Sequence, residues 1–408
     1  MTHNWPPCKL RIDCWNVIHG DATVVRLYPE KLAHIIDFGV HQNVSKSDEQ
    51  DYVEPAIKEA RDVLENVEHI DVFITHFHRD HYYYLHEVLK SKHYHRIYVP
   101  TIPRPTRFRQ RLLRCLACLI AARVPDYEVL ENILSKPEVR PVARGSRIIF
   151  VPYYYYYIDI IWPPRELPPG LREKLTEKID KAYSIVEGVV ERDRELKSRT
   201  DRVFKKLWEL FTREPEEVIE DKIEERGENY FTIEENEKEK DPLTEEEKFK
   251  KLKRALAIVR NIANQLSLII KAFDNRLGCL FLIPGDVPKN ILDYLWTVER
   301  SKRGNKRYWR VVFLRAAHHG TEFGDYLKHH EAIVLWTSWN SRAHLKKPCL
   351  RKYIMNLRPL YLAIAESVRR RTLFVYEFPR YRYRFHIILR SNEEISGGGR
   401  FLHPRLYI

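Results

Sequence analysis

Residues 75–81 read Thr-His-Phe-His-Arg-Asp-His and follow an apolar run, Ile-Asp-Val-Phe-Ile, at residues 70–74. Three histidines and one aspartate therefore fall within six positions, at the spacing HxHxDH. A β-branched run that stops at clustered imidazoles predicts a buried strand whose following loop presents polar side chains at its tip. This stretch is the most specific signal in the chain.

The spacing within this loop suits metal ions. His76 and His78 can converge on one cation, while Asp80 and His81 can turn toward a second cation nearby, as two-metal hydrolytic sites require. Imidazole and carboxylate ligands favour zinc, with manganese or iron as alternatives. We therefore predict a centre of two divalent ions, zinc first and manganese second. The competing interpretation is a solvated loop that is rich in histidine.

The composition is that of a globular protein with excess positive charge. Of 408 residues 44% are hydrophobic, and 70 Lys and Arg against 57 Asp and Glu give a net charge of +13. This balance favours an acidic partner, such as nucleic acid or an anionic surface. Abundant Glu, Lys and Arg together with only 2 Met is typical of thermophilic proteins.

Targeting and redox signals are weak. Residues 1–7 have neither a basic region nor an apolar core, so they do not resemble a secretory signal. No apolar stretch approaches the ~20 residues that span a bilayer, which predicts a cytoplasmic protein without a membrane segment. Cys115 and Cys118 form a CxxC, but they fall on the apolar face of a predicted helix, which favours core packing over zinc.

Strands and helices alternate in the first part of the chain. Residues 9–15, 23–27, 33–39 and 96–100 have strand patterns, and residues 51–66 and 82–90 have helix patterns. Such alternation predicts a layered α/β fold in which the ligand loops gather at one edge of the sheets.

Further short motifs follow the same pattern of a strand ending in polar residues. They are His-Gly-Asp-Ala at 19–22, Ile-Asp-Phe-Gly at 36–39, Pro-Gly-Asp at 284–286 and Ala-His-His-Gly at 317–320. Together with the HxHxDH loop, these motifs resemble the metallo-β-lactamase superfamily. Within it the chain is most similar to the hydrolase domain of the DNA-internalisation competence protein ComEC, whose motifs occur in this order. The resemblance implies an αββα sandwich and a hydrolase.

The second half of the predicted site comes from distant residues. Asp286 follows a Gly turn after an apolar strand, and a carboxylate there can bridge two cations. One of His318 and His319 should complete the second metal, and the position beside the glycine favours His319. His318 is then left to meet a substrate oxygen or to donate a proton.

The resemblance also marks two positions of less certain role. Residues 264–268, Asn-Gln-Leu-Ser-Leu, resemble an element that opens a strand, and many superfamily enzymes have a histidine where this chain has Asn264. The site of the first metal is then more open, binds its ion more weakly, or has a water molecule as the missing ligand. His344 lies in a late Asn…His-Pro element and either faces the cleft or is structural. The predicted catalytic residues are Asp80, His318 and His344.

The stretch from residue 165 to 258 interrupts the resemblance. Its apolar residues recur at helical spacing near 175–190 and again near 249–263, with an acidic loop at 214–240 between them. We predict a charged helical hairpin inserted into a hydrolase domain of residues 1–164 and 259–408. A lid, a dimerisation arm and a partner-binding hairpin are equally compatible with the pattern, and the oligomeric state stays open.

Arginines and tyrosines supply candidate contacts to a polyanion. Arg107 and Arg111 fall on a helix whose other face is apolar, and Arg382 falls in an alternating C-terminal strand. They either bind phosphates or form solvated faces. The five tyrosines at 153–157 could stack on bases, but strand alternation favours their packing in the core.

These observations predict a two-metal hydrolase in which a metal-bound hydroxide attacks a phosphodiester, with DNA or RNA as the favoured substrate. The first alternative is a small-molecule phosphodiesterase that acts on a nucleotide messenger or a phosphocholine-like ester. The second is a nucleic-acid-binding or interaction protein with a vestigial site. The fold by itself does not name a substrate.

Overall fold

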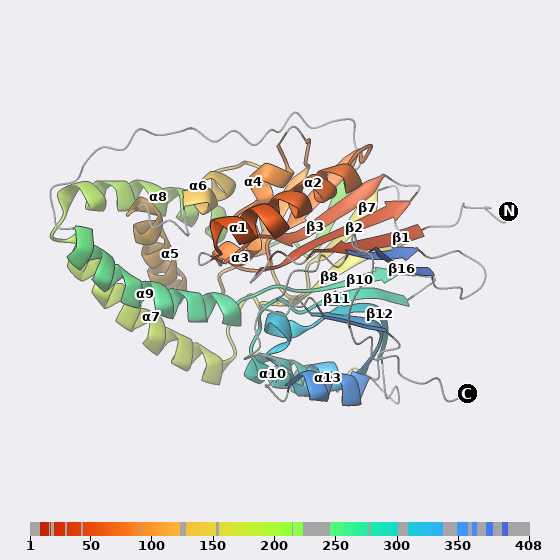
Figure 1. Cartoon of the computed structure of the whole chain (residues 1–408). Helices are drawn as coiled ribbons and strands as arrows, with labels where there is room; N and C mark the ends of the chain where they lie inside the picture. The colour runs from red at the N-terminus through yellow and green to blue at the C-terminus, as the bar shows by residue number, and fades with distance from the viewer. Residues whose placement is uncertain are drawn as a thin grey trace.

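A computed structural model describes residues 9–15, 17, 20–28, 31–41, 44–90, 92–122, 128–151, 155–213, 215–222, 245–275, 278–300, 309–337, 349–357, 361–364, 373–377 and 386–390. The chain forms two large mixed β-sheets with helices around them (Figure 1).

The first sheet has six strands in the order β1-β2-β3-β4-β5-β6. β1 to β3 are antiparallel, and β3 to β6 are parallel. The bounds are β1 Lys9–Cys14, β2 Ala22–Tyr28, β3 Leu32–Phe38, β4 His69–Phe73, β5 Arg96–Pro100 and β6 Val139–Val142.

The second sheet has eight strands in the order β14-β13-β12-β11-β10-β8-β7-β9. β11, β12, β13 and β14 pair in parallel with one another in this order. β7 pairs antiparallel with β8, β8 with β10, and β10 with β11. The bounds are β7 Arg147–Val151, β8 Tyr156–Trp162, β9 Val218–Lys222, β10 Ile269–Asp274, β11 Gly278–Ile283, β12 Trp309–Arg315, β13 His330–Thr337 and β14 Tyr361–Ile364. A separate pair joins β15 Leu373–Glu377 to β16 His386–Arg390.

Helices surround both sheets. Their bounds are α1 Lys46–Asp48, η1 Glu49–Val53, α2 Glu54–Val63, α3 Arg79–Tyr82, α4 Leu85–Val88, α5 Thr106–Ala121, α6 Glu128–Leu134, α7 Pro169–Val190, α8 Arg194–Thr212, α9 Glu245–Gln265, α10 Lys289–Glu299, η3 Ala317–Gly320, α11 Asp325–Lys328 and α13 Cys349–Leu357.

Alternation along the strands divides the core into layers. Val25 and Ile36 join a buried cluster with Phe281 of the second sheet, so these faces of the two sheets pack together. Val24 and Ile35, one position away, join the cluster that includes α2 and α4. A third cluster packs α10, α11 and α13 on the outer face of the second sheet. Figure 1 shows α2 and α10 on opposite sides of the sheets.

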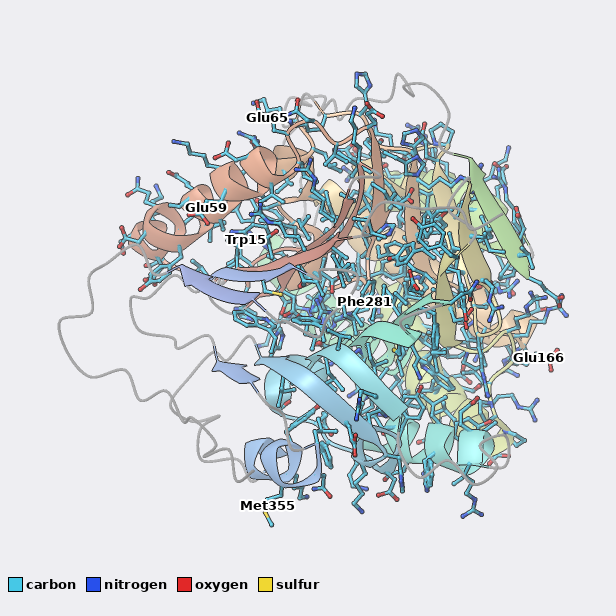
Figure 2. All side chains as sticks on the ribbon, turned by 90° about the vertical axis from the view of Figure 1, so that its right-hand side faces the viewer. Trp15, Glu59, Glu65, Glu166, Phe281 and Met355 are labelled. Carbon is cyan, nitrogen blue, oxygen red and sulfur yellow. The ribbon has the colours of Figure 1, made fainter. Side chains whose placement is uncertain are left out.

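Two labelled side chains illustrate the two outer layers. The indole Nε1 of Trp15 donates a hydrogen bond of 3.0 Å to Glu59 Oε2 on α2, which joins the edge of the first sheet to its helix (Figure 2). Met355 projects from α13 with 62% of its surface exposed (Figure 2). The predicted layered α/β class is therefore confirmed.

The predicted strands of the first sheet are confirmed by β1 to β5. The helix predicted at residues 82–90 is instead two short turns, α3 and α4. In β8 the side chains alternate between buried and partly buried, and Tyr156 is fully buried while Tyr155 and Tyr157 are partly covered. Cys115 and Cys118 are buried in α5, as core packing requires.

The inserted segment differs from the predicted hairpin. Between α7 and α9 the chain forms a further helix, α8, and a strand, β9. β9 lies in the predicted acidic loop, and residues 223–240 of that loop lie outside the described residues. β9 pairs in parallel with β7, so the segment adds an edge strand to the second sheet. The boundary predicted at residue 258 lies inside α9, which is continuous from Glu245 to Gln265.

The helical part of the molecule is also larger than predicted. α5, which precedes the insertion in the sequence, packs against α7, α8 and α9 (Figure 1). Leu112, Leu116, Leu175, Val203 and Val259 share one buried cluster in which these helices meet. The four helices form a bundle that we call the helical unit, and its apolar faces explain why the segment folds onto the sheets.

Candidate metal centre

The polar motifs of the sequence meet at one edge of the two sheets. In the first sheet Asp21 precedes β2, Asp37 lies near the end of β3, and the HxHxDH loop follows β4. In the second sheet Asp286 follows β11, and His318 and His319 follow β12. Because β3 is parallel to β4 and β11 to β12, these strands deliver their carboxyl ends to the same edge of each sheet.

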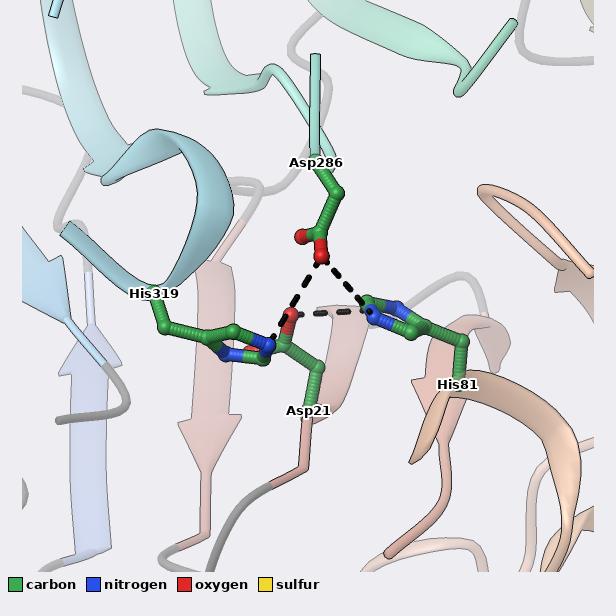
Figure 3. A group of neighbouring side chains, drawn as sticks. All are labelled: Asp21, His81, Asp286 and His319. Atoms are coloured by element: carbon green, nitrogen blue, oxygen red, sulfur yellow. Dashed lines mark ion pairs between the residues drawn. The ribbon is translucent and has the colours of Figure 1, made fainter. Parts of the chain in front are cut away.

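Two groups of side chains in this cluster could hold a cation. The first group is His76, His78 and Asp286, and the second group is Asp21, His81, Asp286 and His319. Within each group the ligand atoms lie within 4.8 Å of one another. Asp286 belongs to both groups, as a bridging carboxylate would (Figure 3 shows the second group).

Distances around Asp286 define the centre of the cluster. Its Oδ2 lies 3.8 Å from His76 Nε2, 3.6 Å from His81 Nε2 and 3.7 Å from His319 Nε2. Asp21 closes the second group, with Oδ2 3.8 Å from His81 Nδ1 and Oδ1 3.7 Å from His319 Nδ1 (Figure 3). Two ligands of a tetrahedral zinc lie roughly 3.4 Å apart, so these spacings are close to those of a metal site.

Three buried atoms at the centre have no hydrogen-bond partner. They are His76 Nε2, His81 Nε2 and Asp286 Oδ1. Leaving a buried polar atom unpaired costs about 1–3 kcal/mol, so three such atoms within one cluster need an explanation. His76 belongs to the first group, His81 to the second and Asp286 to both. Cations held by the two groups would pair with these residues, which therefore fit divalent metals.

Supporting residues hold the ligands in place. Asp37 Oδ2 lies 3.0 Å from His81 Nδ1, and Asp37 also accepts hydrogen bonds from the backbone N–H and the hydroxyl of Thr75 at 2.7 and 2.9 Å. Arg315 is 1% exposed and donates to Asp37 Oδ2 at 2.8 Å. A carboxylate on one ring nitrogen leaves the other nitrogen of His81 available to a metal.

The Asp286 loop requires a glycine at position 285. Gly285 has φ +55°, and a Cβ on it would lie 2.2 Å from Ser267 Oγ. That hydroxyl accepts a hydrogen bond of 3.0 Å from the Asp286 N–H and lies 3.4 Å from His76 Nδ1. The tight turn therefore aligns Asp286 and orients His76 through one side chain.

His318 and His319 lie in a strained turn. Their φ angles are +47° and +51°, a region that costs residues other than glycine about 1–3 kcal/mol each. The turn is held by a hydrogen bond of 3.0 Å from the His318 N–H to the Gly285 carbonyl. It presents both imidazoles to Asp286, with His318 Nε2 at 3.8 Å and a side chain that is 35% exposed.

Charges shift the pKa values of the two groups in opposite directions. Burial, together with the positive charges of neighbouring histidines, lowers the pKa of His76 well below its ordinary value and that of His78 to about 4. Burial also acts to lower the pKa of His81 and His319, but carboxylates outweigh it. The pKa of His81 is raised well above its ordinary value, and that of His319 is raised to about 9.

The structure brings together most of the predicted site. His76, His78, His81, Asp286 and His319 all join the two groups. Asp80 borders the second group, with Oδ2 3.6 Å from His319 Nε2 and 3.9 Å from His81 Nε2. The preference for His319 over His318 agrees with its place in the second group. His344 and Arg382 lie outside the described residues.

Asn264 lies in the last turn of α9, and the element at residues 264–268 leads from the end of that helix directly into β10, which begins at Ile269. The helix continues because residues 251–265 keep a helical apolar pattern up to Leu266. Asn264 Oδ1 is buried without a hydrogen-bond partner, and neither candidate group includes this residue.

Arg107 and Arg111 are engaged within the helical unit. Both guanidinium groups pair with Asp180 of α7, Arg107 at 3.5 Å. Arg114 of the same helix pairs with Glu187 of α7 at 2.9 Å. Arg107 nevertheless keeps 68% of its side chain exposed, while Arg111 is largely covered at 22%. The solvated alternative therefore fits Arg107, and phosphate binding by either residue stays a prediction.

Asp21 is the residue that sequence reasoning missed as a ligand candidate. It was considered only as part of the His-Gly-Asp-Ala motif, without a ligand role, but its carboxylate is buried at the cluster. Its N–H donates a hydrogen bond of 3.0 Å to the carbonyl of Asp80, which joins the start of β2 to the HxHxDH loop. The available signal was an aspartate beside a glycine, directly before a strand.

Among the described residues, no helix combines the length and the apolar character needed to cross a membrane. Comparisons of the chain with protein-family models and with curated proteins find no match.

Proposed function

We propose that this protein is a hydrolase that uses two divalent metal ions, belongs to the metallo-β-lactamase superfamily and cleaves phosphodiesters, with DNA or RNA as the favoured substrate. The observation that carries the proposal is the position of Asp286, which belongs to both candidate groups. A carboxylate shared by two metal sites is the arrangement that two-metal hydrolases use.

The layering of the chain supports the superfamily assignment. Two sheets pack face to face with helices on both outer faces, in the order expected of an αββα sandwich. The HxHxDH loop, Asp286 and the His318–His319 turn lie at one edge of these sheets, in the order of the sequence motifs. The ComEC-like hydrolase group has the same motif order.

In this proposal each side chain has a separate task. His76, His78 and Asp286 would hold one cation, and Asp21, His81, Asp286 and His319 would hold the other. Asp80 orients the ring of His319, since its Oδ2 lies 3.6 Å from His319 Nε2. Two such cations supply positive charge to the transition state and activate water at neutral pH.

His318 contacts the substrate in this proposal. It is the most exposed of the four histidines that approach Asp286, with 35% of its side chain accessible. From this position its Nε2 donates a proton to the leaving oxygen as the ester bond breaks.

The net charge of +13 supports an anionic substrate. A small-molecule phosphodiesterase is the second candidate, and one observation favours it: Arg107 and Arg111 pair with Asp180 rather than standing free for a polyanion. In addition, a small cavity beside the site is lined by apolar side chains of α5, α9 and the loop after β4, with His76 on its wall.

A cleavage assay tests the proposal. Purified protein is loaded with zinc or manganese and given plasmid DNA, single-stranded DNA, RNA, cyclic nucleotides and bis(p-nitrophenyl) phosphate. We expect metal-dependent cleavage of nucleic acid that Asp286→Asn abolishes. Asp62→Asn, which changes an exposed carboxylate on α2, serves as the matched control and should leave cleavage unchanged.

The outcomes separate the candidates. Cleavage of cyclic nucleotides without cleavage of DNA or RNA favours the small-molecule enzyme. Less than one ion per chain after metal loading, together with no cleavage of any ester, would contradict the two-metal hydrolase and favour the vestigial site.

A further inference from the structure

The end of α9 and the residues that follow it contact every ligand of the first group. The carbonyl oxygen of Arg260 lies 3.0 Å from His78 Nε2. Ser267, two residues after the helix, lies with its Oγ 3.4 Å from His76 Nδ1 and accepts a hydrogen bond of 3.0 Å from the Asp286 N–H. This one segment therefore touches all three residues that could hold the first cation.

The hydrogen bond between His78 and α9 fixes which ring nitrogen can bind a cation. A carbonyl oxygen only accepts hydrogen bonds, so His78 Nε2 carries the hydrogen and donates it to the Arg260 carbonyl. The lone pair of the neutral ring is then on Nδ1, which is left for a metal. A metal-binding histidine commonly has its second nitrogen held by a carbonyl or a carboxylate in this way. Here the backbone of α9 supplies that carbonyl.

A second helix of the helical unit packs against the HxHxDH loop. The ring of Phe77, which lies between His76 and His78 in the sequence, meets the ring of Phe211 on α8 edge to face, with 6.0 Å between the ring centroids. Both side chains are buried, Phe77 at 6% and Phe211 at 0% exposed. Aromatic pairs favour this geometry, so α8 holds the residue that joins the two histidines of the first group.

The end of α9 is itself fastened to both sheets. Trp162 Nε1 on β8 donates a hydrogen bond of 2.7 Å to the carbonyl of Gln265, the last residue of the helix. The N–H of Leu268 donates a bond of 2.7 Å to the carbonyl of Thr75, directly before His76. A shift of α9 would therefore be transmitted to the loop. The small cavity that His76 and Phe77 border is also lined by Val259, Ala263 and Leu266.

We infer that the helical unit is a positioning element for the first metal ion. α9 holds His78 in the tautomer whose Nδ1 can bind the ion, and Phe211 of α8 keeps the loop seated against α9. The second group is supported differently, by Asp37 and Arg315 from the two sheets. This inference rests on the proposed function, because it requires a metal ion in the first group. A lid, a dimerisation arm and a partner-binding hairpin would need no such contact with the ligands.

The test uses Phe211, a positioning residue that reaches the first group only through Phe77. Phe211→Ala removes the ring contact, and Phe211→Leu keeps most of the buried volume. The matched control is Leu196→Ala, because Leu196 is 2% exposed on the same helix but lies about four turns before Phe211. The midpoint of thermal unfolding is measured for every variant, so that a general loss of stability is known.

Two readouts do not depend on turnover. Competition with a chromogenic chelator resolves the affinities of the two zinc ions. Nitrogen-15 NMR of protein with labelled histidines identifies the tautomer of His78 in the metal-free state. We expect the Nε2–H tautomer in the wild type and a mixture of tautomers in Phe211→Ala.

The variants should separate positioning from stability. Phe211→Ala should weaken the first ion by on the order of tenfold and leave the second nearly unchanged. Phe211→Leu should recover most of the lost affinity. Leu196→Ala should lower the midpoint of thermal unfolding but keep both zinc affinities and the tautomer of His78.

Three results would overturn the inference. They are the Nδ1–H tautomer of His78 in the metal-free wild type, equal weakening of both ions in Phe211→Ala, and the same weakening of the first ion in Leu196→Ala. If Phe211→Ala does not fold, Phe211→Leu decides by the same comparison, with a smaller weakening confined to the first ion as the expected result. A wild type that binds no zinc would count against the proposed function, while the tautomer in metal-free protein tests the contact with α9 separately.

Discussion

The two candidate groups share Asp286 but differ in their resting charge. In the first group the pKa values of His76 and His78 are lowered by burial and by neighbouring positive charge, so both rings are neutral near pH 7. In the second group carboxylates raise the pKa values of His81 and His319, so both rings hold protons without a metal. The neutral histidines of the first group can bind a cation directly, whereas the histidines of the second group must first release their protons.

The difference follows from where the carboxylates lie. Asp21, Asp37 and Asp80 all approach His81 or His319. Asp80 and Asp286 also act to raise the pKa of His76 and His78, but burial and the neighbouring positive charge outweigh them. The neutral carbonyl of Arg260 lies on His78. The same buried environment therefore produces two sites that differ in proton affinity. We expect the first group to bind its ion before the second group does.

Removing the shared carboxylate should have the largest effect. Asp286→Asn keeps the size of the side chain but removes the charge that both groups use. We expect metal affinity to fall in both groups by more than the roughly 10–100-fold that loss of a supporting residue costs. Metal analysis per chain after dialysis measures this, with Asp62→Asn as control. Retention of one tightly bound ion would show that Asp286 serves a single group.

Removing Asp21 should separate the two groups. Asp21→Asn takes a carboxylate from His81 and His319 of the second group and from Arg315, but from no histidine of the first group. We expect the ion of the second group to be lost while the ion of the first group stays, which competition with a chromogenic chelator resolves as two affinities. Equal weakening of both affinities would contradict the division of ligands between the groups.

The sequence predicts the HxHxDH loop better than the contribution of Asp21, for a physical reason. His76, His78, Asp80 and His81 are neighbours in one loop after one strand, so their spacing alone indicates a shared site. Asp21 meets this loop through a hydrogen bond from its N–H to the Asp80 carbonyl, a contact between segments that no local pattern encodes. The predicted strands follow from local alternation in the same way.

The helical unit shows the opposite case. The periodic apolar residues of α7 and α9 were detected, but α8 was missed although Leu196, Val203, Leu207 and Phe211 are buried at helical spacing. The many charged residues between these apolar positions made the helical pattern of α8 hard to detect. The ion pairs of Arg107 and Arg111 with Asp180 depend on how α5 packs against α7, which the sequence of α5 does not contain. A basic face read from one helix therefore does not show which of its arginines pair with a neighbouring helix.

Changing pH should alter the second group more than the first. The pKa of His319 is about 9 and that of His78 about 4. Between pH 6 and 9 binding to the first group should release few protons, while affinity of the second group should rise by up to about tenfold per pH unit for each protonated histidine. Calorimetry in buffers of different ionisation enthalpy counts the protons. Equal proton release at both sites would contradict the comparison.

The same shifts determine how the metal-free protein responds to pH. The pKa of His319 is raised in the folded state, so its protonation stabilises the folded protein fully at pH values below the ordinary histidine pKa of 6.5. This contribution is lost as pH rises through about 9. The lowered pKa of Asp286 contributes above its ordinary value of 3.8 and is lost as pH falls below it. In EDTA the midpoint temperature of thermal unfolding should therefore decrease as the pH is raised from 6 to 10. Bound zinc should remove that fall, because it takes the place of the protons.

The smallest effect should come from the hydroxyl that supports the first group. Ser267 Oγ lies 3.4 Å from His76 Nδ1 and accepts from the Asp286 N–H, whereas Thr75 Oγ1 lies 3.2 Å from both His76 Nδ1 and His81 Nδ1. Ser267→Ala should weaken the first ion by about tenfold and the second by less. The two affinities are read from the same chelator competition, with the exposed Ser47→Ala as control. If both ions weaken equally, Ser267 acts through the shared Asp286 loop, and the orientation of His76 depends on Thr75 alone.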